Sequence, residues 1–228
     1  VPVPCVPNQA IGMQLGARGT STNLSGASFT DATRDQVFIT GGLFRRVDWG
    51  FQGGLVVDYL HEDWYYRASA LQIRGELSWV YPQCHELGFW FTASTKAATI
   101  EDVDIDFDDI DLNQVNIEPV DMFAFFYRRR FEHMCGGYGR LYAGFTGQSD
   151  GLIGADLKVP LTDNWAVESG FTYLIPSNDD QRNAHRDEAW NVFVGLVWYP
   201  GLRKATGNDY FRPLFNVADN GTFMLDRM

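Results

Sequence analysis

Apolar and polar residues alternate with a period of two along much of the chain, which is the pattern of β-strands. In residues 189–199 the even positions are all apolar and carry tryptophan at both ends, whereas the odd positions are small, polar or mixed. The distance from Trp190 to Trp198 along a strand is roughly 26 Å at about 3.3 Å per residue. This span matches the apolar band of about 25 Å, bounded by aromatic residues, of outer-membrane β-barrels.

Further segments with the same alternation predict an all-β chain of about ten strands. Residues 71–81 and 165–175 each place apolar side chains on one face and polar or charged side chains on the other. The remaining predicted strands are residues 11–18, 36–46, 50–60, 87–95, 121–131, 138–146 and 152–161.

The connections between these strands alternate in length. Short turns are expected at residues 47–49, 82–86, 133–137 and 162–164, and most of the links between them are longer or more polar, as in residues 97–116. Outer-membrane barrels place short turns in the periplasm and long loops outside. The sequence therefore predicts a transmembrane antiparallel up-and-down β-barrel over residues 1–200.

Residues 201–228 follow the last predicted strand and form a C-terminal tail, expected on the periplasmic side. Phe211, Leu214, Phe215 and Phe223 make this tail more apolar than a typical linker. We therefore expect it to plug the interior or to bind a neighbouring protein, with disorder as the alternative.

Composition narrows the class of protein. A length of 228 residues suits one all-β domain, and no apolar run approaches the 18 residues of a membrane-spanning helix. The net charge of −11 argues against nucleic acid as a partner. The chain opens at Val1 without the features of a signal peptide. We expect that such a peptide was removed on export, or that the sequence starts inside the gene product.

The chain contains the strings PVPCVPNQAIGMQLGAR, GGLFRR, GGLVVDYL, HELGFW, FFYRRRF, GFTGQSDGLIGADLKVPL, FTYLIPS, WNVFVGLVWYPG and FRPLFNVADNGTFMLDR. Together these strings resemble an uncharacterised, porin-like outer-membrane family of bacteria with unusual cell envelopes, known as a domain of unknown function. The resemblance extends from Pro2 to Arg227, and GADLKVPL and VWYPG are its most specific parts. It implies a secreted outer-membrane barrel and supplies no substrate or catalytic residue. Members of that family usually carry more chain before PVPC, so the resemblance implies twelve strands if N-terminal strands are missing.

Charged residues on the inward-facing positions of the strands are the main functional candidates. They either form ion pairs that hold a narrow barrel shut, or line a constriction that selects small polar or anionic solutes. Because bases outnumber acids among them, an open interior is expected to prefer anions. These residues are Arg74, Glu76, Arg128, Arg130, Arg140, Asp156, Lys158 and Glu168.

Two other groups of side chains suggest chemistry. Asp102, Asp104, Asp106 and Asp108 share one face of an extended segment and predict a structural Ca²⁺ site, with a solvated acidic hairpin as the alternative. No other cofactor is expected.

Cys84 and Cys135 lie in short turns at one rim, where a disulfide is one interpretation and two unpaired thiols the other. Lipidation of Cys5 is not favoured, because VPVPC lacks the small residues expected before a lipoprotein cysteine.

No catalytic group stands out, so we do not expect an enzyme. His61 or His185 beside Asp58 or Asp179 is the only arrangement considered for a catalytic rim, and loop solvation explains these residues equally well. The expected function is a porin-like passage for small polar solutes in the bacterial outer membrane, where lipid is the first partner. The alternative is a structural scaffold with a closed interior that assembles into an oligomeric surface complex. A soluble β-sandwich is a third hypothesis, against which the paired tryptophans argue.

Overall fold

The computed structural model describes residues 11–23, 33–64, 66–82, 84–103, 117–131, 137–177, 189–198 and 213–227. The elements in these ranges are all β-strands. No helix within them has the length and apolar character needed to cross a membrane. The all-β fold predicted from the alternation is therefore confirmed.

In the described part of the chain, ten long strands form one antiparallel sheet in the order β1-β2-β3-β4-β5-β7-β8-β9-β10-β11, as the sequence pattern predicts. Two short strands lie off this path, since β12 pairs with β6 and β6 pairs with β5. The strands are β1 (Gly12–Asn23), β2 (Thr33–Arg45), β3 (Gly50–Asp63), β4 (Tyr66–Tyr81), β5 (His85–Val103), β6 (Ile117–Pro119), β7 (Met122–Arg130), β8 (Tyr138–Thr146), β9 (Gly151–Pro160), β10 (Trp165–Ile175), β11 (Ala189–Trp198) and β12 (Leu225–Arg227).

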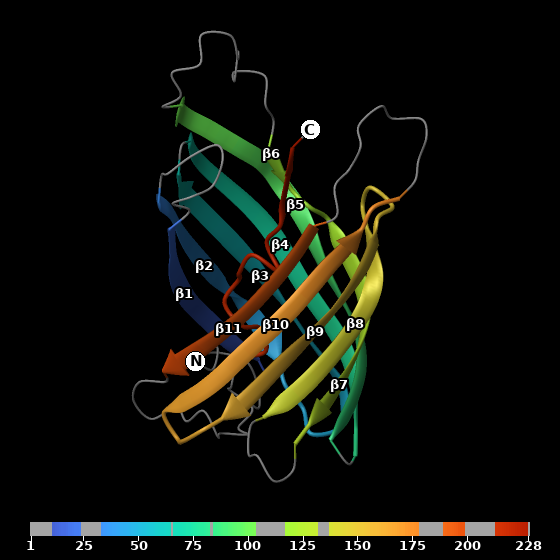
Figure 1. Ribbon diagram of the computed structural model, residues 1–228. Coiled ribbons are helices and arrows are strands. Elements are labelled where there is room, and N and C mark those ends of the chain that lie inside the picture. The colour runs from blue at the N-terminus through green and yellow to red at the C-terminus, as the bar shows by residue number, and fades with distance from the viewer. Residues whose placement is uncertain are drawn as a thin grey trace.

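The sheet curls on itself, so that β1 to β3 lie opposite β9 to β11 (Figure 1). Within the described ranges β1 and β11 form the two ends of the strand order and do not pair with each other. The turns 46–49 and 161–164, together with residues 82 and 84, lie at one end of the curl, here called the short-turn rim. The observed architecture is thus a half-barrel.

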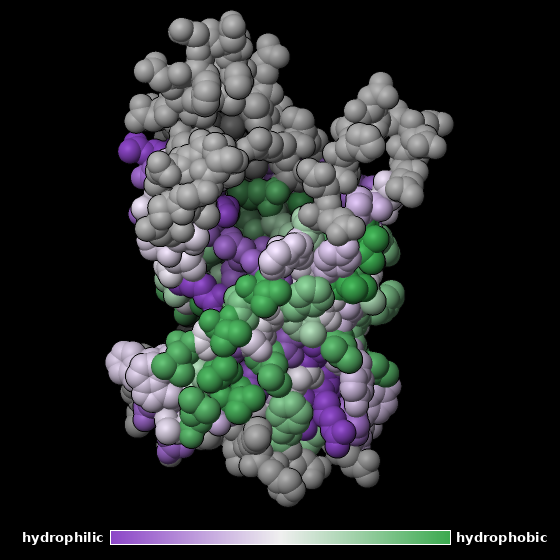
Figure 2. Space-filling view, in the orientation of Figure 1, coloured by the Kyte–Doolittle hydropathy of each residue, from purple (hydrophilic) through white to green (hydrophobic). Residues whose placement is uncertain are grey.

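Large apolar side chains cover the outside of the curl. In β11 exposed and half-buried residues alternate without interruption, and the exposed set includes Trp190, Val194 and Trp198. Figure 2 shows apolar side chains gathered over β10 and β11 on the face in view. The same outward pattern recurs on the opposite wall, where Leu55, Leu77 and others are exposed. The period-two pattern therefore separates an apolar outer face from an inner face that carries charged and polar side chains together with buried apolar clusters.

The described part of the tail, residues 213–227, lies inside the curl (Figure 1). Arg46, at the short-turn rim, donates a hydrogen bond to the carbonyl oxygen of Pro213 at 2.7 Å. At the opposite rim β12 pairs with β6, with Leu225 opposite Pro119. The tail thus crosses the whole interior, which is the plug arrangement among those expected from its apolar residues.

Apolar contacts fix the tail against the inner wall. Phe223 packs its ring edge against Phe38, with 6.3 Å between ring centroids, in a buried cluster that includes Leu60. Leu214 and Phe215 pack with Phe44 and Val56 in a second buried cluster. These inward apolar residues of β2 and β3 are buried because the tail covers them.

We predict that Phe223→Ala destabilises the fold by about 3 to 5 kcal/mol, because it leaves a cavity between the tail and β2. Denaturant unfolding of the purified protein measures this change. Val217→Ala is the matched control, since Val217 is only partly buried against the same cluster, and should cost less. Equal costs would show that Phe223 does not anchor the tail.

Candidate functional site

The eight charged residues expected inside the barrel all lie in the described part of the chain and all face the interior. They come from β4, β7, β8, β9 and β10, and each occupies the parity that points away from the outer apolar face. The sheet register sets Arg128 opposite Arg140, Arg140 opposite Asp156, and Lys158 opposite Glu168. The last two register pairs bring opposite charges together on the inner wall, whereas Arg128 and Arg140 are like charges that both contact Glu76.

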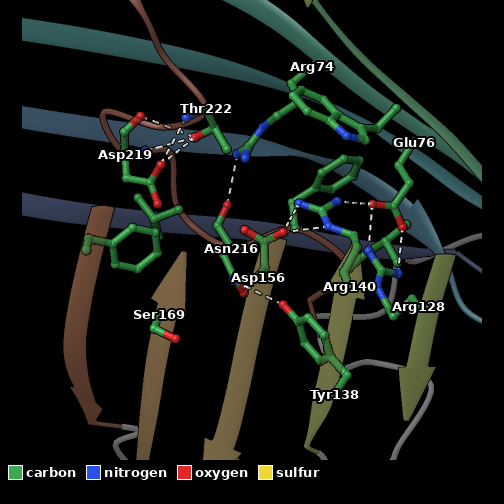
Figure 3. A pocket seen from close by; sticks show the side chains of 15 residues that line it. Arg74, Glu76, Arg128, Tyr138, Arg140, Asp156, Ser169, Asn216, Asp219 and Thr222 are labelled. Carbon is green, nitrogen blue, oxygen red and sulfur yellow. Dashed lines mark hydrogen bonds and ion pairs between the residues drawn. The ribbon is translucent and has the colours of Figure 1, made fainter. Parts of the chain in front are cut away.

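Arg128 forms the centre of this cluster (Figure 3). Its Nη1 and Nη2 atoms lie 2.8 Å from Oε1 and Oε2 of Glu76, which is the bidentate geometry of a strong arginine–carboxylate pair. The Nη1 atom also lies 2.8 Å from Oε1 of Glu86. One buried guanidinium thus joins β4, β5 and β7.

Arg140 extends the cluster toward β9. Its Nε atom donates to Oδ2 of Asp156 at 2.6 Å, and its Nη1 atom lies 3.3 Å from Oε2 of Glu76. Glu76 therefore receives hydrogen bonds from two guanidinium groups, Arg128 and Arg140. Aromatic rings face the same cations, with Phe126 centred 4.8 Å from the Arg128 guanidinium and Tyr142 centred 5.4 Å from that of Arg140.

Three further ion pairs continue along the inner wall. Arg74 lies 2.9 Å from Asp58, whose Oδ1 atom also accepts a hydrogen bond from Thr40 at 2.6 Å. Lys158 lies 2.9 Å from Glu168. Arg130, more exposed than the others, reaches Glu86 at 3.5 Å. Each predicted interior charge thus has a partner of opposite sign.

The prediction that positive charge is in excess inside the curl is wrong. The predicted interior acids are only Glu76, Asp156 and Glu168, but Asp58, Glu62, Glu86 and Asp219 also pair with interior cations. Arg18 and Arg34 are further interior cations that were not predicted. The ion pairs of the described interior then contain as many carboxylates as cations, which removes the basis for anion preference.

Little space remains at the centre of this cluster. A cavity of about 40 Å³ lies among Arg74, Arg128, Asp156 and the tail residues Asn216 and Asp219. A buried water needs at least about 10 to 15 Å³ on this measure, so the cavity accommodates water and excludes larger solutes. The tail closes it, as Asn216 donates to Tyr138 at 3.2 Å and its carbonyl oxygen accepts from Arg74 at 2.9 Å.

Other predicted sites fall wholly or partly outside the described residues. The side chain of Asp102 and the whole of Asp104, Asp106 and Asp108 are among these, so the calcium hypothesis stays a prediction. In the ranges that the structure describes, no three His, Cys, Asp or Glu side chains are arranged to hold a metal. Cys84 carries a free thiol. Its proposed disulfide partner, Cys135, lies outside the described residues, as does Cys5.

The described residues do not form the catalytic arrangement that the sequence suggested, which is a histidine beside an aspartate. His61 faces outward and contacts Ser69 Oγ at 3.0 Å, whereas Asp58 is fully buried on the inner face. The sheet therefore separates His61 from Asp58. His185 and Asp179 lie outside the described residues.

Comparison with known proteins gives a family and nothing more specific. A family model described as a family of unknown function, DUF6666, matches residues 1–225. No curated protein and no solved structure matches the chain.

The geometry of the cluster predicts that Arg128→Gln is strongly destabilising. Removing one partner of a buried pair typically costs about 3 to 5 kcal/mol, because the remaining charge has lost its counter-ion. Arg129→Gln is the matched control, since Arg129 is the next residue on β7 and its side chain is exposed. Denaturant midpoints of the two variants test this, and a midpoint for Arg128→Gln no lower than that of Arg129→Gln would exclude a structural role for the cluster.

Proposed function

The chain belongs to this family of unknown function, and we propose that it is an outer-membrane β-barrel protein with a closed interior and a structural role in the bacterial envelope. The observation that carries the proposal is the inverted distribution of polarity, with apolar side chains outside the curl and paired charges inside it. We do not propose an enzymatic activity.

The outer face supports the membrane part of the proposal. Contiguous apolar patches on soluble monomers rarely exceed a few hundred Å², whereas exposed large apolar residues here lie on every long strand of the sheet. A bilayer provides the apolar surroundings that such a surface needs. The exposed residues include Met13, Leu15, Val37, Ile39, Leu43, Phe51, Leu55, Val57, Leu77, Leu87, Phe125, Leu141, Phe145, Ile153, Leu157, Phe171, Val192, Val194 and Leu196.

Aromatic side chains mark the two limits of this band. At the short-turn rim Trp49 contacts Trp79, and Trp165 contacts Trp198. Toward the other rim Trp190 lies opposite Tyr173 in the register of β10 and β11. Aromatic residues at both interfaces are characteristic of outer-membrane barrels, and this supports the assignment to that membrane.

The interior supports a structural role. A passage for solutes needs an aqueous path, but the tail crosses the curl, and the cavity among the central ion pairs has a volume of about 40 Å³. A barrel closed in this way is suited to anchoring other components of the envelope. Outer-membrane lipid is then its first partner, and copies of itself or a larger envelope assembly are the second.

Passage of small polar solutes is the second candidate function. It is favoured by a cavity of about 590 Å³ beside the tail, which Arg18, Arg46 and Lys158 help to line. In this alternative the tail moves and the polar inner wall becomes a pathway. The two functions differ in whether the folded protein conducts ions.

For membrane insertion, we predict that Val194→Arg destabilises the protein in lipid vesicles by about 2 to 4 kcal/mol, the range for arginine on the lipid face near the bilayer midplane. Asn191→Arg, on the opposite face of β11, is the control and should cost less. Urea unfolding in vesicles measures both variants. If the cost for Val194 does not exceed that for Asn191, the assignment of the outer face to lipid is wrong.

For the closed interior, we predict that the folded protein shows no ion conductance in planar bilayers, because tail and ion pairs fill the lumen. Steady channels in the intact protein would overturn the structural role and support solute passage. In that case Arg128→Gln with Arg130→Gln tests whether these cations contribute, through the reversal potential in a salt gradient.

A further inference from the structure

The path of the tail inside the curl has a single direction. Three tail residues contact wall residues that lie at successively greater distances from the short-turn rim. The pairs are Phe215 with Gln14 at 3.2 Å, Asp219 with Arg18 at 3.1 Å, and Asn220 with Gln36 at 3.0 Å. Because Gln36 lies opposite Thr20, these contacts cover residues 14–20 of β1, roughly 20 Å at about 3.3 Å per residue. The tail therefore advances along β1 away from the short-turn rim.

The tail extends beyond these contacts at both ends (Figure 1). It starts at the short-turn rim, beside Arg46. At the opposite rim the N–H of Val120 donates to the carbonyl oxygen of Met224 at 2.8 Å, next to the pairing of β12 with β6. The N–H of Gly147, in the turn between β8 and β9, donates to the carbonyl oxygen of Asp121 at 2.8 Å, so this turn lies at the same rim. The described tail thus begins at one rim and ends at the other.

Side chains of the wall hydrogen-bond the backbone of the tail along this path. Irregular backbone is tolerated at membrane depth only where protein or a water-filled cavity surrounds it. Thr40 accepts a hydrogen bond from the N–H of Ala218 at 3.0 Å. The donors to tail carbonyl oxygens include Gln14 to Phe215, Arg74 to Asn216, Thr172 to Gly221 and Gln72 to Thr222. The wall thus supplies the partners that an additional crossing of the membrane needs.

The two rims differ in the links between their strands. The long links 24–32, 104–116 and 176–188 follow strands that end at the rim opposite the short turns. Outer-membrane barrels place long loops outside and short turns in the periplasm. In the proposed membrane, the tail therefore starts on the periplasmic side and ends on the outer side.

We propose that the tail carries the chain across the outer membrane inside the lumen and displays residues 225–227 at the cell surface. The wall alone returns the chain to the periplasmic side, because β11 ends at the short-turn rim, where Trp198 lies opposite Trp165. This proposal rests on the membrane insertion proposed above. It gives the tail a role beyond closing the interior, since a segment held through the whole barrel is a firm attachment point for another component of the cell surface.

Cysteine labelling determines on which side the end of the tail lies. Serine replaces the three native cysteines, and single cysteines are then introduced into the exported full chain. The three variants are Asp226→Cys in β12, Ser149→Cys in the turn between β8 and β9, and Asp163→Cys in a short turn. Ser149 and Asp163 are exposed and serve as references for the two rims. Intact and permeabilised cells are treated with a membrane-impermeant maleimide.

In intact cells Asp226→Cys should be labelled to the same extent as Ser149→Cys, whereas Asp163→Cys should be labelled only after permeabilisation. If Ser149→Cys is labelled in intact cells but Asp226→Cys only after permeabilisation, the tail stays on the periplasmic side and the proposal is overturned, with membrane insertion intact. Labelling of Asp163→Cys but not Ser149→Cys in intact cells inverts the orientation and overturns surface display. Equal labelling of Ser149→Cys and Asp163→Cys in intact cells overturns membrane insertion itself.

An epitope inserted after Arg227 provides a second readout that does not depend on the reactivity of a thiol at position 226. An antibody against the epitope should bind intact cells that carry this variant. The control has the same epitope between Thr162 and Asp163, an exposed turn of the kind that tolerates insertions, and should bind antibody only after permeabilisation. Binding to the Arg227 variant only after permeabilisation overturns the proposal, even where Asp226→Cys does not react.

Discussion

The bidentate pair between Arg128 and Glu76 is the interaction on which the rest of the interior depends. An arginine remains charged in a protein interior, so the fold must supply carboxylates around it. Glu76 from β4 and Glu86 from β5 do so, and they reach Arg128 on β7 only because β5 separates β4 from β7 in the sheet. The pairing of the central charges therefore depends on the order of the strands in this wall.

The tail completes the opposite wall in a different way. Phe38, Phe44, Val56 and Leu60 point inward from β2 and β3 and would face water in an open lumen, which is unfavourable for large apolar side chains. Phe223 and the other apolar tail residues bury them. Ion pairs between strands and apolar contacts with the tail thus stabilise the interior together. A tail with this role is part of the core, which favours a permanently closed interior over an occasional plug.

The sequence predicts the strands well because alternation is a local property, readable from a few neighbouring residues. The same parity places Arg74, Arg128 and Glu168 inside correctly. Asp58 has the inward parity of the strand predicted over residues 50–60, so the alternation contained a signal for it. Glu62 has the same parity but lies beyond residue 60, where the predicted strand ends and β3 continues to Asp63. Asp219 carried no such signal, since it lies in the irregular tail and reaches Arg18 from a position 201 residues away in the chain. Contacts of that separation depend on the curl of the whole sheet, which no local pattern contains.

Charge balance in the interior also determines which residues carry the net negative charge of the protein. Because interior carboxylates and cations offset one another in the described ion pairs, the net charge of −11 must come from residues outside this network. The segment 101–111 contributes much of it, and its acids are Glu101, Asp102, Asp104, Asp106, Asp108, Asp109 and Asp111. For a closed structural barrel, the balanced charges of the interior then stabilise the fold, and the net charge of the protein is carried by residues that take no part in these ion pairs.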